Sequence, residues 1–188
     1  MEVVEAIRAR RAKRAFQDKP VEDDKIDALV EAVRLSASCN NNQPWRIVIC
    51  KGKEALAAAK DALPRGNAWA TRAPVIMVVS AKPVDDCQLP DRRDYFLFSS
   101  GLAIGQLELR ATELGLVAHP IAGYDPLKAK AVLGIPEEYV VITFVIVGYP
   151  GGDDSLLSDK QKANELTRPE RKPIGENFFI DKWGAPYR

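Results

Sequence analysis

The sequence predicts an α+β domain in which a sheet of about four strands lies between helices. Four short runs rich in β-branched residues predict the strands, and Ala-rich or amphipathic stretches predict the helices. The two kinds of element do not alternate regularly, and no Gly-x-Gly-x-x-Gly motif follows a predicted strand, so a Rossmann fold is unsupported. The chain has 188 residues, 46% of them hydrophobic, which is enough for one domain with a real core.

The first half of the chain is predicted to hold three helices and two strands. The second helix begins in an acidic turn at 22–24, where negative charge suits the helix dipole. Its expected apolar stripe consists of Ile26, Leu29, Val30 and Val33. In order, the predicted elements are a helix at 2–9, the helix after 22, a polar loop at 36–44, a strand at 45–50, a helix at 53–63 and a strand at 74–80.

The second half is expected to begin with a long helix at 91–115. This helix is apolar around nearly its whole circumference, so we expect a second subunit to cover part of it. A strand at 116–121, a helix from Asp125-Pro126 to Gly134 and a strand at 139–147 follow. The polar tail at 151–188 is interpreted as an extended arm of the single domain 1–188. Its apolar anchors on the partner subunit would be Ile174, Phe178, Phe179, Ile180 and Trp183.

Composition excludes several classes of function. Lys plus Arg number 27 and Asp plus Glu 26, a balance that argues against nucleic acid or a membrane as the partner. No stretch is long and apolar enough to span a membrane, and no signal peptide is apparent. Cys39, Cys50 and Cys87 have no metal-like spacing and predict free thiols in a reducing compartment, which indicates a cytoplasmic location. No metal site is expected.

Two clusters in the first half of the chain are candidates for ligand binding. Arg10, Arg11 and Arg14 offer three guanidinium groups within five residues, a pattern that suits a phosphate. The alternative is a solvated basic face. The run at 38–45 offers amide donors and acceptors of the kind that a planar heteroaromatic ring requires. The alternative is a turn stabilised by Asn side chains.

Two further clusters follow in the second half. The segment 119–125 connects a strand to a helix, and Pro120 and Gly123 give it an irregular backbone whose N–H groups are candidates to face a ligand. The segment 168–173 carries cations between prolines that keep it extended, so these cations are candidates to join the first cluster on one phosphate. An ordinary turn and a charged linker are the alternatives. His119, the only histidine, is interpreted as a packed residue.

Together these clusters resemble the nitroreductase family. A family motif of the form R-R-S-x-R-x-F corresponds to residues 10–16, and a loop of the form P-S-x-x-N-x-Q-P-W corresponds to residues 37–45. The matching segments farther along are 67–69 with 73–76, 114–116, 120–125, 171–173 and 182–184. Ala12 stands where the family usually has Ser, and Ala37 where it usually has Pro. The resemblance spans essentially the whole chain and implies a mostly antiparallel sheet of four to five strands in a homodimer with exchanged arms.

The resemblance also implies FMN as the cofactor and NADH or NADPH as the electron donor. Arg10, Arg14 and Arg171 would hold the phosphate, and the loop around Ser38 would reach the flavin of the other subunit. The residues implied to bind FMN are Arg10, Arg11, Ala12, Arg14, Ser38, Cys39, Asn41, Gln43, Asn67, Pro120, Ile121, Ala122, Gly123 and Arg171. No catalytic side chain is expected, because the flavin carries the hydride.

The expected activity is therefore a two-step reduction of a small electron acceptor such as a nitroaromatic or a quinone. Within the resemblance, the alternatives are dehalogenation, flavin fragmentation and ring dehydrogenation, because one fold hosts several chemistries. A non-catalytic FMN-binding regulatory module is the alternative from another class. A helical nucleic-acid binder that uses the N-terminal arginines fits poorly with the near-zero net charge.

Overall fold

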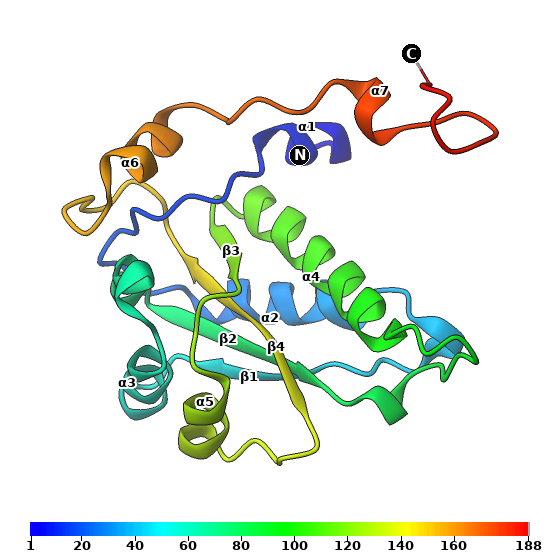
Figure 1. The fold of residues 1–188 in the computed structure, drawn as a ribbon. Helices are drawn as coiled ribbons and strands as arrows, with labels where there is room; N and C mark the ends of the chain where they lie inside the picture. The colour runs from blue at the N-terminus through cyan, green and yellow to red at the C-terminus, as the bar shows by residue number, and fades with distance from the viewer. Residues whose placement is uncertain (188) are drawn as a thin grey trace.

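The computed structural model describes residues 1–187 and contains a four-stranded antiparallel sheet with helices on both faces (Figure 1). The strands are β1 (Arg46–Cys50), β2 (Val75–Ala81), β3 (Val117–Ile121) and β4 (Val140–Gly148), in the spatial order β1-β2-β4-β3. The helices are α1 (Val3–Ala9), α2 (Asp23–Arg34), α3 (Lys53–Asp61), α4 (Tyr95–Glu113), α5 (Pro126–Leu133), α6 (Asp159–Leu166) and α7 (Ile174–Asn177). Three 3₁₀ turns are η1 (Cys39–Asn41), η2 (Arg65–Arg72) and η3 (Pro83–Asp85). The predicted α+β class and the antiparallel sheet of four strands are confirmed.

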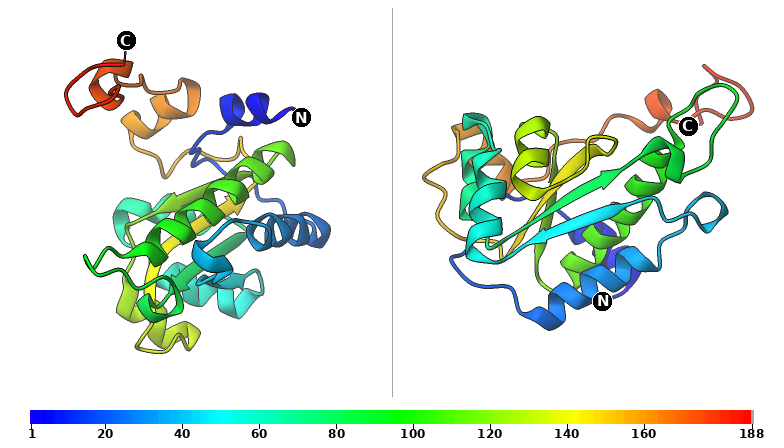
Figure 2. Two further views of the ribbon diagram at one scale, coloured as in Figure 1. Left: turned by 90° about the vertical axis from the view of Figure 1, so that its right-hand side faces the viewer. Right: turned by 90° about the horizontal axis from the view of Figure 1, so that it is seen from below.

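Strand β2 shows why both faces of the sheet are covered. All of its residues are buried, and successive side chains point to opposite faces. Met77 and Val79 pack with α2 and α4, whereas Ile76 and Val78 pack with α3, η2 and α5 (Figure 2). Burial of one such side chain contributes about 1.5–3 kcal/mol, so the two layers fix the sheet that carries the loops described below.

The chain after α1 is held alongside the chain after β4. Phe16 forms an antiparallel bridge with Pro150, and the Gln17 amide donates to the Tyr149 carbonyl over 2.9 Å. A Cβ at Gly152 would lie 1.5 Å from the Phe16 carbonyl oxygen, so no other residue fits this close approach. The two crossing segments therefore bring residues 10–14 next to the beginning of the arm.

Helix α4 is buried on one side only. Phe96, Ala103 and Leu107 face the core, while Phe98 is 56% exposed and Leu102 is 40% exposed. The helix begins at Tyr95 rather than at 91, because residues 91–94 form an irregular turn in which Arg92 has a φ of 60°. The side of α4 that faces away from the core thus forms a hydrophobic strip on the surface of the chain.

The arm after residue 151, which was predicted to be extended, contains two helices, α6 and α7. Helix α6 begins with a reciprocal capping box between Ser158 and Gln161, which supplies the hydrogen bonds that a helix start requires. No residue of α6 is buried. The predicted anchors Phe178 and Trp183 are 61% and 90% exposed in the single chain.

The prediction of three free thiols is wrong. Cys39 and Cys87, 48 residues apart in the sequence, form a disulfide with a Cα–Cα distance of 6.0 Å, and only Cys50 is free. The expectation of a cytoplasmic location rested in part on free thiols and loses that support. Within residues 1–187, no helix is both long enough and apolar enough to cross a membrane.

Candidate functional site

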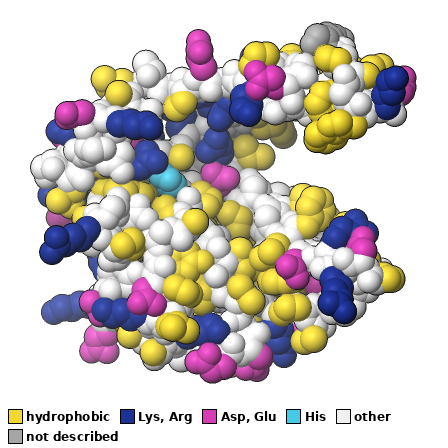
Figure 3. Space-filling model, viewed as in Figure 1, with side chains coloured by type: hydrophobic (Ala, Val, Ile, Leu, Met, Phe, Trp, Pro, Cys, Tyr) yellow, Lys and Arg dark blue, Asp and Glu magenta, His cyan; other side chains and the backbone are white. Residues whose placement is uncertain are grey.

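A cationic cavity of about 250 Å³ lies between the segment after α1 and the arm. Figure 3 shows dark blue Lys and Arg side chains gathered between the arm and the body of the domain. The described side chains that line the cavity include five guanidinium groups and no carboxylate. The residues that line it are Arg10, Arg11, Ala12, Arg14, Asn164, Arg168, Pro169 and Arg171. The structure thus brings together the first and the fourth clusters seen in the sequence.

Two of these arginines hold the arm in place. Arg11 donates to the backbone carbonyls of Asn164 at 2.6 Å and Leu166 at 3.2 Å, at the C-terminal end of α6. Arg168 donates to the carbonyls of Arg8 at 2.7 Å and Arg10 at 2.6 Å, at the C-terminal end of α1. The last carbonyls of a helix lack partners inside the helix, so each guanidinium caps the helix of the other segment.

The remaining arginines differ in how far they are already neutralised. Arg10 pairs with Glu108 of α4 at 3.2 Å; burial raises the pKa of that carboxyl group while Arg10 opposes the rise. Within the described chain, the guanidinium groups of Arg14 and Arg171 have no hydrogen-bonded or ion-paired acceptor. Burial together with Arg10, Arg171 and Arg11 lowers the pKa of Arg168. Arg14 and Arg171 are therefore the cations free to take an anionic ligand.

Trp69 connects the cavity to the next cluster. The guanidinium carbon of Arg14 lies 5.6 Å from the centroid of the Trp69 ring, within the range of a cation–π contact. The Trp69 ring is only 2% exposed, and its Nε1–H donates to Asn67 Oδ1 at 3.2 Å. The indole thus forms a rigid link between Arg14 and Asn67.

Asn67 in turn holds the loop that follows β3. Its Nδ2 donates to the Gly123 carbonyl at 2.8 Å, and a Cβ on Gly123 would lie 2.6 Å from that nitrogen. Of the residues predicted to line the flavin here, Pro120 is half-buried, Ala122 is exposed, and the Ile121 side chain packs in the core. Ile121 can therefore take part in ligand binding only through its backbone.

His119 lies beneath the arginine segment and has a structural contact. Its Nδ1–H donates to the Lys13 carbonyl at 2.9 Å, and its ring centroid lies 4.9 Å from that of Trp69. Burial, with smaller contributions from the charges of Arg14 and Arg10, lowers the pKa of His119 to about 4, although the hydrogen bond to the Lys13 carbonyl opposes the change. The neutral imidazole is a poor proton donor at neutral pH, and it orients the backbone between Arg10 and Arg14.

The predicted loop at 38–43, which includes η1, lies at the other end of the sheet (Figure 1). Ser38 Oγ accepts from the Gln43 amide at 2.9 Å, and Gln43 Nε2 donates to the Asn41 carbonyl at 3.1 Å. Asn40, Asn41 and Gln43 all have positive φ values, which is unusual for residues other than glycine. In a single chain, Ser38, Cys39, Asn41 and Gln43 do not join the cationic cavity.

Some partners in the site are placed only by the fold. Asn164 carried no motif signal, Trp69 appeared only within the matching segment 67–69, and Arg168 appeared only as part of a charged run. Asp86 and Cys87 gave no signal either, because their neighbour Cys39 is 48 residues from Cys87. Among the described residues, Cys39, Asp86 and Cys87 are the one group with clustered ligand atoms, but the two sulfurs are bonded to each other.

Comparison with known proteins gives a consistent result. The model of the nitroreductase family matches residues 7–68 and 62–149. A protein of Methanothermobacter thermautotrophicus, assigned as an NADH dehydrogenase/NAD(P)H nitroreductase, is 28% identical over 97% of this chain and 88% of its own. A crystal structure described as an oxidoreductase containing FMN has a TM-score of 0.83 and 25% identity, covering 96% of this chain and 92% of that chain. A nitroreductase family protein from Clostridium difficile has a TM-score of 0.79 and 21% identity, covering 97% and 99% of the two chains.

Proposed function

The chain belongs to the nitroreductase family, and we infer that it is an FMN-dependent oxidoreductase that takes electrons from NADH or NADPH. The observation that carries the inference is the convergence of arginines from residues 10–14 and 168–171 on one cavity that has no carboxylate in its lining. A terminal phosphate monoester carries close to two negative charges at neutral pH and binds best where several guanidinium groups meet.

The residues present fit FMN rather than FAD. Arg14 and Arg171 have unengaged guanidinium groups, and Ala12 lines the same cavity without the hydroxyl that the family motif usually supplies. A pyrophosphate is commonly bound by a Gly-rich turn at a helix N-terminus, and no such turn follows a strand here. We propose that Arg14 and Arg171 bind the phosphate, while Arg10 beside Glu108 adds a weaker positive field.

FMN bound here would supply the hydride chemistry that links the nicotinamide to the second substrate. The protein supplies orientation. Asn67 fixes the loop after β3 through the Gly123 carbonyl. We propose that the backbone of Pro120 to Gly123 lies along the ring system, with the Ala122 N–H directed at it. Trp69 contacts both Asn67 and Arg14 and so fixes the position of this loop relative to Arg14. The binding sites for the phosphate and for the ring are thereby held in a fixed relation.

We further propose that the enzyme is a homodimer in which the arms are exchanged. The exposed strip on α4 includes Phe98 and Leu102, and the arm presents Phe178 and Trp183 to solvent. Apolar side chains gathered in this way on a single chain mark a protein interface. A second copy related by a two-fold axis would cover the strip and the arms, and an isologous contact forms two equivalent sites. It would also bring Ser38, Cys39, Asn41 and Gln43 to the partner's cavity.

The proposed acceptors are nitroaromatics, quinones or similar flat molecules, reduced in a second step after the oxidised nicotinamide has left. The test begins with the absorption spectrum of the purified protein and chromatography of the cofactor released by acid. Steady-state oxidation of NADH and of NADPH, with and without a quinone or a nitroaromatic, then follows. We expect FMN at one per chain, acceptor-dependent oxidation and parallel double-reciprocal plots. Released FAD, or bound FMN without nicotinamide oxidation, would contradict the proposal.

A further inference from the structure

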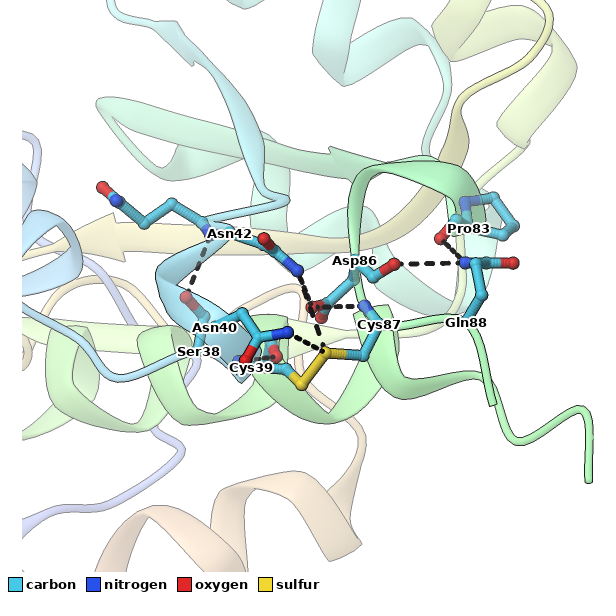
Figure 4. Close-up of a disulfide and its surroundings, with 10 residues drawn as sticks. Ser38, Cys39, Asn40, Asn42, Pro83, Asp86, Cys87 and Gln88 are labelled. Carbon is cyan, nitrogen blue, oxygen red and sulfur yellow. Dashed lines mark hydrogen bonds between the residues drawn. A yellow bond between two sulfur atoms is a disulfide. The ribbon is translucent and has the colours of Figure 1, made fainter. Parts of the chain in front are cut away.

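The disulfide between Cys39 and Cys87 lies against a buried carboxylate (Figure 4). The side chain of Asp86 is buried, and one of its carboxylate oxygens lies with the two sulfurs in a group whose atoms are all within 4.8 Å of one another. Asp86 Oδ1 accepts from the Cys87 amide at 2.8 Å and from Asn42 Nδ2 at 3.2 Å. Asp86 Oδ2 is buried and has no hydrogen-bond partner among the described residues.

We propose that Cys39, Asp86 and Cys87 form a reversible dithiol–disulfide centre, in which a cysteine S–H of the reduced form donates to Asp86 Oδ2. An acceptor left unsatisfied in the interior costs free energy, and this one has no neighbouring donor while the sulfurs are bonded to each other. Reduction creates two S–H donors beside it. The buried carboxylate therefore stabilises the dithiol more than the disulfide, and makes the pair easier to reduce than an isolated structural bridge.

The surroundings of the two sulfurs give them different roles in thiol–disulfide exchange with a partner. Asn40 Nδ2 and Asn42 Nδ2 direct their N–H groups at Cys87 Sγ, at 3.5 Å and 3.9 Å. Such donors stabilise a thiolate, so Cys87 is the better leaving group and Cys39 is the sulfur attacked. Cys39, like Cys87, is half-buried, which leaves it accessible to an external thiolate.

The exchange partner is a dithiol. One of its thiolates attacks Cys39 Sγ, the bond between Cys39 and Cys87 breaks, and Cys87 leaves as a thiolate that takes up a proton. The second thiol of the partner then attacks the mixed disulfide and releases Cys39. The net change converts the protein disulfide and one dithiol into a protein dithiol and one oxidised partner, with two electrons and two protons transferred.

The centre controls the loop at 38–43. The disulfide ties η1 to the chain after η3, across 48 residues of sequence. The hydrogen bond from the Cys39 amide to Ser99 Oγ on α4 is long, at 3.5 Å, and holds Cys39 only weakly. The left-handed backbone of Asn40, Asn41 and Gln43 stores strain that the cross-link helps to hold. Reduction is therefore expected to loosen this loop. The inference stands on these contacts alone and does not require a bound cofactor.

The test equilibrates the folded protein at pH 7 in buffers with graded ratios of reduced to oxidised dithiothreitol. Acid quenching, maleimide labelling and intact-mass measurement then count the free thiols. The wild-type protein is expected to gain two labels in one transition, while buried Cys50 provides the constant background after unfolding. Asp86→Asn keeps an oxygen for the Cys87 amide but removes the acceptor of the S–H. It should need a roughly three- to tenfold higher ratio for half-reduction.

Asp91→Asn is the matched control, because Asp91 is on the same loop, is exposed and pairs with Arg93. Its midpoint should equal that of the wild type. Hydrogen exchange at 38–43 should speed up on reduction and in Cys87→Ser. Equal midpoints for Asp86→Asn and the wild type would overturn the proposal, as would a pair that resists reduction until the protein unfolds. Flavin content and activity do not enter these measurements, so this proposal and the proposed function fail independently.

Discussion

Arg11 and Arg168 fasten the two ends of the chain to each other by capping each other's helices. The guanidinium of Arg11 donates to Asn164 and Leu166 at the end of α6, and that of Arg168 donates to Arg8 and Arg10 at the end of α1. The guanidinium groups of Arg11 and Arg168 thus use hydrogen bonds to stabilise the fold. Their charge still contributes to the potential of the cavity, but their hydrogen bonds are not available to a ligand.

Arg168→Ala should therefore release the arm. The substitution removes two charge-assisted hydrogen bonds, and amide exchange in α1 and α6 should rise roughly tenfold or more. Hydrogen exchange followed by mass spectrometry measures this directly. Lys172→Ala removes an equal charge from the same segment, but Lys172 pairs only with exposed Glu176 and should leave exchange unchanged. Equal protection in both variants would contradict the capping role.

Arg14→Ala should weaken FMN retention strongly while leaving the fold intact, because this guanidinium is free to take a phosphate. Loss of a charged hydrogen bond costs on the order of 1.5–3 kcal/mol, or about ten- to a hundredfold in the dissociation constant. Lys13→Ala is the control, since Lys13 does not line the cavity. Fluorescence titration of the flavin-free protein with FMN gives both constants. Identical constants would show that the cluster is only a solvated basic face.

Gly123→Ala tests the contact between Asn67 and the loop after β3. The added Cβ would lie 2.6 Å from Asn67 Nδ2, so the amide must leave the Gly123 carbonyl. We expect a loss of about 1–3 kcal/mol in the free energy of unfolding, together with weaker FMN binding. Adding Asn67→Ala should remove most of the clash, and the double-mutant cycle measured by urea unfolding gives the coupling. Additive effects would show that the two residues act separately.

Phe98→Glu tests the proposed dimer. Phe98 is 56% exposed in the single chain, so the charge should be tolerated by a folded monomer but excluded from an apolar interface. Sedimentation velocity should show a dimer for the wild type and a monomer for the variant. Leu127→Glu places the same charge on α5, at a residue that is 71% exposed and lies on the opposite face of the sheet. It should remain dimeric, and a monomeric wild-type protein would refute the proposal.

His119 should make stability fall between about pH 6.5 and 4. Its pKa is lowered to about 4 in the folded protein, so in this window the unfolded chain binds a proton that the folded chain does not. The contribution of His119 to stability is therefore fully present above the unfolded pKa and is lost as the pH falls, by about 3 kcal/mol in total. Urea unfolding as a function of pH measures the slope. It should be shallower in His119→Gln, and an unchanged slope would exclude His119 as its source.

The sequence by itself determined the features that depend on near neighbours. The strands followed from β-branched runs, and α5 began at Asp125-Pro126 and ended at Gly134 as expected, because caps and turns are set within a few residues. The arginine motif and the Asn-rich loop were also visible, and so was the family to which the chain belongs. The sequence did not reveal that Val30 is exposed, because hydrophobic periodicity does not show which side of an apolar stripe lacks a packing neighbour.

Only the tertiary structure decided how these pieces are used. It assigned Arg11 and Arg168 to helix capping and left Arg14 and Arg171 free, although all four look alike in sequence. It paired Cys39 with Cys87, placed the Asp86 carboxylate beside them, and left Asp86 Oδ2 without a hydrogen-bond partner among the described residues. The physical reason is common to both cases. The roles of charged and sulfur-containing side chains depend on distances between residues far apart in the chain, and folding alone sets those distances.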